Sequence, residues 1–183
     1  MEERFWFRSG HIALDLALAG GPGWRSRWEV LNEPADLAAW LAASPLGVGE
    51  VRTTAADLAI AHELREALWH LGLAAAATEP LPRSWLATLN RAAARPGLQP
   101  RLVATGRRSW HRPTAARALA SIATAGVELL GGEAAAQVRR CQGDRCWLLF
   151  VDTSPARSRR WCSMSRCGNR AKVRSHRARA AGT

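Results

Sequence analysis

All four cysteines of this 183-residue chain lie near its C-terminus, in two pairs of equal spacing. Four residues separate Cys141 from Cys146, and four separate Cys162 from Cys167. Thiolates are preferred ligands of structural Zn²⁺, and four of them form a closed tetrahedron around it. A segment this short buries little apolar surface, so a metal ion is expected to stabilise it. The two pairs therefore predict one structural Zn²⁺ site.

Other uses of the four thiols stay open at this stage. Two disulfides would also consume every cysteine, or the thiols could stay free, but a reducing cytosol disfavours disulfides. An iron–sulfur cluster accepts the same ligands. A catalytic zinc ion usually keeps an open position beside three protein ligands, and four cysteines leave none. We therefore expect a structural ion and not a catalytic one.

The residues around the cysteines predict the shape of this module. Trp147–Val151 is typical of a strand, Thr153–Pro155 of a turn and Arg159–Cys162 of a returning strand. Such a hairpin would bring the two cysteine pairs together. From Gly168 the sequence favours a helix, which completes the hairpin-plus-helix arrangement of a treble-clef-like finger.

Charge is divided unevenly along the chain. Residues 1–138 carry 14 Arg and 13 Asp or Glu, a net charge of +1, whereas residues 139–183 carry 12 Lys or Arg and 2 Asp, a net charge of +10. A block of this kind attracts polyanions, because basic side chains displace the counterions condensed on them. The charge therefore predicts a nucleic-acid surface, with a solvated basic tail as the alternative.

On a helix from Gly168, Arg170, Arg174 and Arg177 would share one side, because their spacing is i, i+4 and i+7. Arginine suits bidentate contact to phosphate or guanine edges. Phosphate contacts carry no sequence information, so RNA is an alternative partner to DNA. The predicted nucleic-acid contacts are Arg157, Arg159, Arg160, Arg170, Lys172, Arg174 and Arg177.

The N-terminal part predicts a mainly helical domain with short strands, so the fold class is α+β. Gly10–Leu16 is an ordered entry segment or the start of a helix. Capping signals and apolar spacing predict helices that start at Asn32 as N-cap, at the Thr54–Asp57 capping box, at Pro82 and at Thr114, with a small hairpin between Leu98 and Arg112. This domain would cover residues 1–132 and the finger residues 138–180.

Several segments resemble known families. Phe150–Ser154, Arg160–Met164 and Cys167–Lys172 resemble the bacterial CGNR zinc finger family, in the family's order. Gly10–Asp15, Asp36–Leu41 and Leu64–Leu68 resemble the ABATE domain that accompanies this finger. The resemblance implies a stress-associated bacterial transcription regulator, with the four cysteines as zinc ligands.

The main functional hypothesis is a regulator whose finger binds DNA while the helical domain forms a homodimer or senses a small-molecule effector. The alternative is a zinc-stabilised module that binds another protein, or an RNA binder. An enzyme is a third hypothesis, based on His11, Asp15, His62 and His70, but no nucleophile elbow, phosphate loop or HExxH motif is present.

The sequence also predicts where the protein acts. No N-terminal stretch has the order of a secretory signal, and no apolar run reaches the roughly 20 residues that span a bilayer. We expect a cytoplasmic protein without membrane contact, associated with the nucleoid when bound to DNA.

Overall fold

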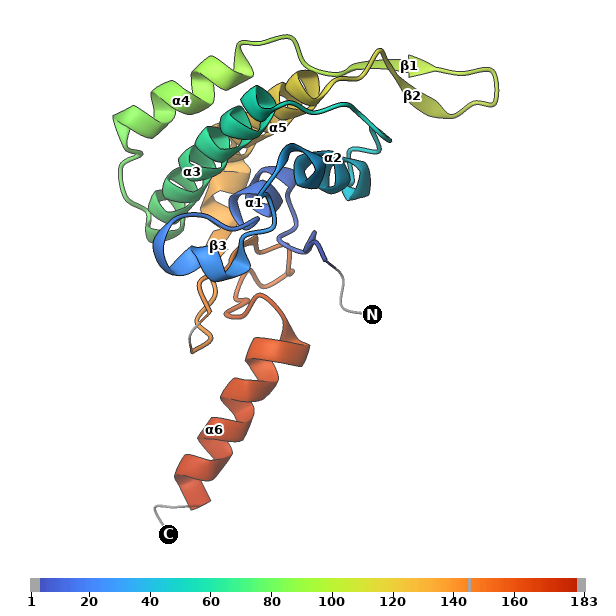
Figure 1. Cartoon of the computed structure of the whole chain (residues 1–183). Helices are drawn as coiled ribbons and strands as arrows, with labels where there is room; N and C mark the ends of the chain where they lie inside the picture. Colours follow the sequence, from blue (N-terminus) through green and yellow to red (C-terminus); the bar gives the residue numbers. More distant parts are fainter. Residues whose placement is uncertain (1–3, 145, 181–183) are drawn as a thin grey trace.

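The computed structural model describes residues 4–144 and 146–180, without the side chains of residues 175, 176 and 178–180. Most elements gather around one long helix, and the last helix projects away from them (Figure 1). In chain order the elements are α1 (Ile12–Ala17), η1 (Gly23–Trp28), α2 (Pro34–Ala43), α3 (Ala55–Ala77), α4 (Arg83–Ala93), β1 (Gln99–Leu102), β2 (Arg108–His111), α5 (Ala115–Gly131), η2 (Glu133–Gln137), β3 (Val138–Arg140), β4 (Leu149–Val151), η3 (Met164–Gly168) and α6 (Asn169–Ala180).

Helix α3 is the centre of the core and contacts α1, α2, α4 and α5. Its Leu64, Leu68 and Leu71 are buried together with Trp40 of α2. A Cβ atom at Gly126 of α5 would lie 2.6 Å from Cδ2 of Leu68, so glycine allows α5 to pack this close. Among the described residues, no helix is both long and apolar enough to cross a membrane.

The helix starts follow local signals in the sequence, with one correction. The predicted capping box is present at α3, where the backbone N of Asp57 donates to Thr54 Oγ1 and the backbone N of Thr54 donates to Asp57 Oδ2. At α2 the N-cap is Glu33 and not Asn32. The reason is Asp36, whose Oδ2 accepts the backbone amides of both Asn32 and Glu33, so the helix begins one residue later than predicted.

The other predicted elements of the N-terminal part are confirmed. The entry segment forms the short helix α1, and the helices predicted from residues 82 and 114 appear as α4 and α5. The predicted hairpin is β1 paired antiparallel with β2, with Gln99 opposite His111. This hairpin extends away from the helices (Figure 1). Trp110 Nε1 fastens its base by donating to the carbonyl O of Leu46 at 2.9 Å, whereas Leu102 is 77% exposed.

The second hairpin forms with a different partner from the one predicted. Strand β4 pairs antiparallel with β3, with Val138 opposite Val151. The prediction of a returning strand at Arg159–Cys162 was wrong, because these residues form no strand. The first cysteine pair closes a tight turn directly between β3 and β4, so the segment before that turn pairs with β4.

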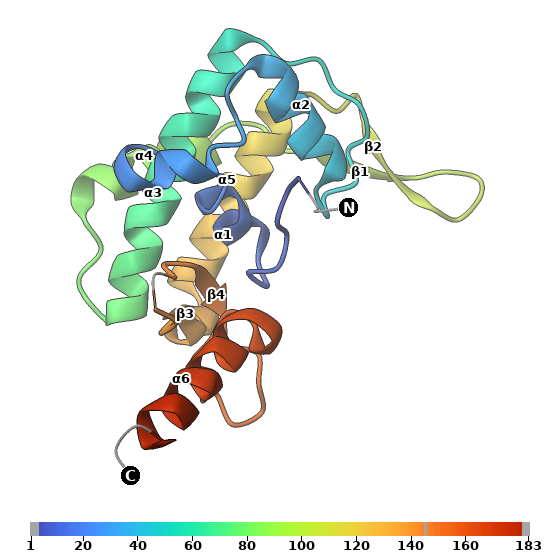
Figure 2. The ribbon, with the colours of Figure 1, turned by 60° about the horizontal axis from the view of Figure 1, so that its bottom comes forward.

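Hairpin β3–β4 is continuous with the helical core. Val138, Leu149 and Val151 are buried in the same apolar cluster as α3. A Cβ atom at Gly72 of α3 would lie 2.8 Å from Cδ1 of Leu149, so glycine at this position makes room for the leucine of β4. On the other edge of β4, the backbone N of Val151 donates to the carbonyl O of Ser9 at 2.8 Å. Figure 2 shows β3 and β4 between the helices and α6.

The division of the chain into a helical domain of residues 1–132 and a finger of residues 138–180 stays a prediction.

Candidate metal centre and nucleic-acid interface

The four cysteine sulfurs converge where hairpin β3–β4 meets η3. Their Sγ atoms all lie within 4.8 Å of one another. Those of Cys146 and Cys167 are each 3.7 Å from Sγ of Cys162. A tetrahedral Zn²⁺ with Zn–S bonds of about 2.3 Å places its sulfurs about 3.8 Å apart. The donor set and its spacing therefore fit one structural Zn²⁺ ion, with Cys141 as the fourth ligand.

Backbone amides near Cys141 favour its thiolate. The N atoms of Gly143 and Cys162 lie 3.4 and 3.3 Å from Cys141 Sγ and donate to it. Hydrogen bonds to the charged form stabilise that form, and such outer contacts orient metal ligands. Gly143 is also required by space, because a Cβ atom there would lie 2.8 Å from Sγ of Cys167. The first pair therefore forms a close turn that admits the second pair.

The clustered thiols shift one another's pKa values. Hydrogen bonds from the Cys146 and Cys162 thiols lower the pKa of Cys141 to about 2. The contact with Cys141 raises the pKa of Cys146 to about 12, and contacts with both neighbours raise the pKa of Cys162. Cys141 therefore ionises more readily than Cys146 and Cys162. A divalent cation replaces these shared protons, and its affinity therefore falls as the pH falls.

Asp152 organises the loop between the two cysteine pairs. Its buried Oδ1 accepts hydrogen bonds from the backbone N and the hydroxyl of Ser154, and its Oδ2 accepts one from the backbone N of Arg159 at 2.8 Å. Burial alone would raise the pKa of Asp152, but these hydrogen bonds outweigh it and keep the pKa below its ordinary value. This role was not predicted, although an Asp two residues before Ser at a strand end is typical of an Asx turn.

Element η3 and helix α6 form a rod that projects from the rest of the protein (Figure 1). Arg170, Arg174 and Arg177 border one hollow of about 560 Å³ on this rod, so the three arginines expected on one side do share it. Arg166 borders the same hollow and was missed, because the helix was expected to start at Gly168. Its i, i+4 spacing to Arg170 was the available signal.

Partners within the protein engage Arg174 and Arg159, which were both predicted to contact nucleic acid. Arg174 forms an ion pair with Asp144, with Nη1 2.5 Å from Oδ2. The Nε atom of Arg159 donates to the carbonyl O of Trp161, and its guanidinium lies 4.7 Å from the ring centre of Phe150. Arg159 therefore supports the loop and is less available to a ligand than its charge suggested.

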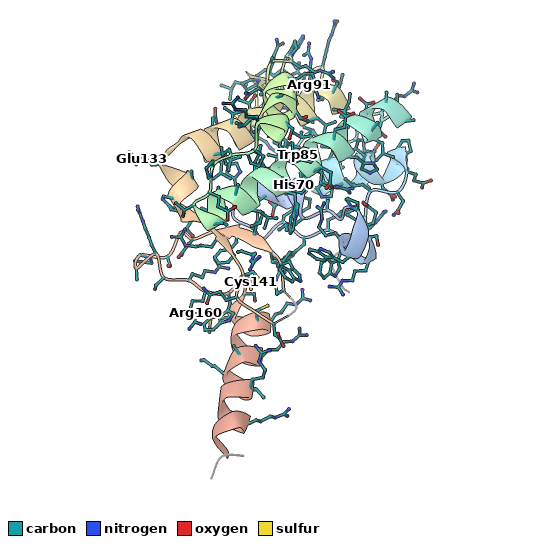
Figure 3. All side chains as sticks on the ribbon, turned by 90° about the vertical axis from the view of Figure 1, so that its left-hand side faces the viewer. His70, Trp85, Arg91, Glu133, Cys141 and Arg160 are labelled. Carbon is teal, nitrogen blue, oxygen red and sulfur yellow. The ribbon has the colours of Figure 1, made fainter. Side chains whose placement is uncertain are left out.

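The other predicted contacts are exposed but dispersed. Arg157, Arg160 and Lys172 all face solvent. Arg160 Nε donates to Gln142 Oε1 at 2.7 Å, near the metal site and the start of α6 (Figure 3). Lys172 follows Arg170 by two residues and thus lies on another side of α6. That any of these side chains contacts nucleic acid stays a prediction.

Comparison with known families covers nearly the whole chain. The profile of ABATE, described as "Putative stress-induced transcription regulator", matches residues 10–133. The chain belongs to the ABATE family. The profile of the CGNR zinc finger matches residues 137–180, which contain all four cysteines. No curated protein matches the chain. The resemblances and the structural Zn²⁺ site predicted from the sequence are thereby confirmed.

Within the ABATE segment, His11 and Asp15 stabilise the start of the chain. His11 caps α1, where its Nδ1 accepts from the backbone N of Ala13, and burial lowers its pKa. Asp15 is 4% exposed and accepts the backbone N of Ser9 at 3.0 Å, and burial raises its pKa. Because Ser9 in turn accepts from Val151, these residues link the ABATE segment to strand β4.

The histidines of α3 form no second metal site. His62 Nε2 lies 2.9 Å from the carbonyl O of Leu31. The ring of His70 stacks on Trp85 with ring centres 4.7 Å apart, in a part of the helical core away from the cysteines (Figure 3). In the part of the chain that the structure describes, the four cysteines are the only cluster of three or more potential metal ligands.

A buried ion-pair network fastens η1 to α3 and was not predicted. Arg65 Nη1 lies 2.7 Å from Oε1 of Glu29, and Arg25 pairs with Glu66. Both arginines are also held by backbone oxygens, Arg65 by Ala19 O and Arg25 by a neighbouring glycine O. The partners of these two ion pairs lie 36 and 41 positions apart in the sequence, so no local pattern reveals them. The network sets the position of η1 and its tryptophans.

Proposed function

We propose that this ABATE protein is a DNA-binding transcription regulator whose zinc finger presents α6 to DNA. In this proposal the helical domain forms a homodimer or senses a small-molecule effector, and the protein acts in the cytoplasm at the nucleoid. The family description names transcription regulation, and the observation that carries DNA binding is the basic side of η3–α6.

The geometry of α6 supports contact with a groove. Twelve residues at about 1.5 Å each give a rod of about 18 Å, which fits within one groove of DNA. The sequence of α6 is mainly basic, and its Val173 is 49% exposed, so the helix offers no buried apolar stripe that would pack on a protein core. Arginines at i, i+4 spacing repel one another by about 0.2–0.5 kcal/mol per pair, and a row of phosphates relieves that repulsion.

Substitution of two arginines tests this role. We expect Arg170→Gln with Arg177→Gln to weaken DNA binding and to reduce the slope of log affinity against log salt by about 1 for each lost contact. A mobility-shift assay over a salt series measures both effects. The matched control is Arg83→Gln with Arg95→Gln, which removes the same charge from exposed positions in and after α4. Equal losses in the two double variants would show that total charge and not α6 determines binding.

Nuclease treatment separates DNA binding from the alternatives. A regulator that binds DNA is recovered from cell extract with DNA fragments that DNase removes. RNA fragments that only RNase removes would support the RNA alternative. A protein partner retained after both nucleases, with no binding to DNA in the mobility-shift assay, would support a protein-interaction module and contradict the proposal.

A further inference from the structure

A cavity of about 870 Å³ lies between the ABATE segment and the zinc finger. Its walls come from residues 4–6 and 8, the end of α1, η1, the first cysteine turn and the start of η3–α6, together with Trp40 of α2 and Trp69 of α3. Three of the four cysteines of the zinc site also border it. Small-molecule sites commonly have volumes of about 300–1,000 Å³ and lie where two structural units meet. Neither zinc binding nor contact of α6 with DNA requires a cavity at this place.

Tryptophans from both sides line the cavity. Trp24 of η1 lies edge-on to Trp28, with ring centres 5.3 Å apart, and its ring centre is 5.4 Å from that of Trp147 in the cysteine turn. These three indoles remain 46%, 42% and 40% exposed. Neighbouring exposed aromatic rings in a concave surface are unfavourable in water, and they offer faces and edges to a planar apolar group.

The cavity wall is fixed before any ligand arrives. Arg25 and Glu66 hold η1 against α3, and Trp69 of α3 packs edge-on to Trp24 at 6.0 Å. The guanidinium of Arg25 also lies 4.5 Å from the ring centre of Trp69. A preorganised wall loses little conformational entropy on binding, which favours affinity for a small ligand.

Three cationic side chains around the cavity are available to bind an anionic group. The guanidinium of Arg27 lies 4.2 Å from the ring centre of Trp28. Arg166 and Arg170 approach from the finger. Within residues 4–144 and 146–180, none of these three arginines forms an ion pair, so each can receive an anionic group.

The acidic residues on the walls are already engaged. Glu29 is paired with Arg65, and Asp144 with Arg174. Asp15 is buried beneath the wall. Cys146, Cys162 and Cys167 also border the cavity, and a Zn²⁺ ion held by four thiolates carries a net charge of about −2. Arg27, Arg166 and Arg170 together carry about +3, so positive charge remains in excess and an anion is preferred over a cationic ligand of the same shape.

Two arginines belong to both the cavity and the proposed DNA surface. Arg166 and Arg170 line the cavity and also border the hollow on the basic side of α6. An anion that binds these guanidinium groups from the cavity reduces the charge that they offer to phosphate. Ligand and DNA therefore compete for the same two side chains.

We propose that this cavity is an effector site for a small planar aromatic anion, with the rings among Trp24, Trp28 and Trp147 and the acidic group near Arg27, Arg166 and Arg170. Occupancy of the site weakens DNA binding. The second statement rests on the proposed function, whereas the first does not.

Two probes that differ in one charge test the site in the zinc-loaded full chain. The anion 1-anilinonaphthalene-8-sulfonate and the neutral N-phenyl-1-naphthylamine share their rings, and both change fluorescence on binding. We expect one sulfonate probe per chain, bound about tenfold more tightly than the neutral probe. Equal affinities for the two probes, or several weak sites per chain, would overturn the proposal.

Variants locate the probe. Trp24→Ala and Arg27→Gln are expected to weaken binding of the sulfonate about tenfold, and Arg27→Gln to leave the neutral probe unaffected. The controls Trp85→Ala and Arg83→Gln change the same residue types outside the cavity and should bind the sulfonate as the unmodified chain does. Thermal unfolding checks that each variant is folded. Should Trp24→Ala unfold, the result for Arg27→Gln alone tests the location of the probe. Arg27 is exposed, so its substitution removes charge without disturbing the fold.

The coupling between probe binding and DNA binding is measured in both directions. Saturating sulfonate probe should raise the Kd for DNA about tenfold, and saturating DNA should raise the Kd for the probe by the same factor, because coupling is reciprocal. The neutral probe and the Arg27→Gln variant should show no such effect at the same concentrations. Probe binding without any change in DNA affinity would contradict the regulatory statement. Absence of DNA binding altogether would contradict the proposed function and leave the site to be decided by the probes.

Discussion

The two hairpins of this protein have similar lengths and opposite roles. Hairpin β1–β2 extends from the helices with most of its residues exposed, and its Leu102 is in solvent. Hairpin β3–β4 is buried between α3 and the zinc site, and Leu149 is fully covered. Two-stranded hairpins are marginally stable alone. The difference shows that β3–β4 is stabilised by what surrounds it, namely the helical core on one face and the metal on the other.

Metal removal should have the largest effect, and it should destabilise the finger while the helical core stays folded. Structural zinc contributes on the order of 10 kcal/mol to small fingers. We expect chelation, or Cys162→Ser, to abolish protection of amides in residues 141–168, while α3 and α5 keep theirs. Hydrogen exchange followed by mass spectrometry measures this. Loss of protection throughout the chain would mean that the metal also maintains the helical core.

Truncation of one leucine in each hairpin compares them directly. Leu149→Ala should lower the free energy of unfolding by about 2–5 kcal/mol, because it leaves a cavity against α3. Leu102→Ala should change it by less than about 0.5 kcal/mol, since its side chain contacts water. Urea denaturation of both variants gives the values. Similar losses in the two would show that β1–β2 is covered in solution, as it would be in a homodimer.

Asp152 tests whether the loop after β4 is part of the same stable unit. Asp152→Ala leaves the half-buried amides of Ser154 and Arg159 without their acceptor and should destabilise the protein by about 1–3 kcal/mol. Thermal unfolding of the zinc-loaded protein measures the loss. Asp152→Asn retains one acceptor oxygen, so its melting temperature should lie between those of the unmodified chain and Asp152→Ala. An unchanged melting temperature for Asp152→Ala would show that the loop opens independently of the hairpin.

Asp15 gives a smaller, pH-dependent effect on the edge of β4. Because its pKa is raised in the folded protein, its contribution to stability is fully present below the unfolded pKa of about 3.9 and is lost as the pH rises through the folded value. The stability of Asp15→Asn relative to the unmodified chain should therefore increase from pH 4 to pH 7. Urea midpoints across this range test the sign. A difference that decreases with pH would contradict it.

Local signals in the sequence predicted much of this structure. The Thr54–Asp57 box starts α3 because its side chains and amides satisfy each other within one turn. The spacing of the cysteines identified the metal ligands because four soft donors at close range have few other uses. Both predictions depend on residues within a short distance along the chain.

Features that join distant segments were not predicted. Strand β3 has three residues and no strand pattern of its own, and the packing of Val138 and Leu149 in the helical core supports the pairing that the cysteine turn allows. The pairing of Arg25 with Glu66 joins residues 41 positions apart. The cavity between the ABATE segment and the finger is formed by segments far apart in the sequence, so only the folded chain reveals that Trp24 and Trp147 meet.

The seam between α3 and hairpin β3–β4 limits how this protein can be cut or recombined. A graft of residues 138–180 onto another carrier would expose Val138, Leu149 and Val151, and the donor would be left with the notch at Gly72 open to water. Both products would expose apolar surface that favours aggregation. The ABATE segment and the finger therefore share one apolar core, and separating them exposes part of that core on each piece.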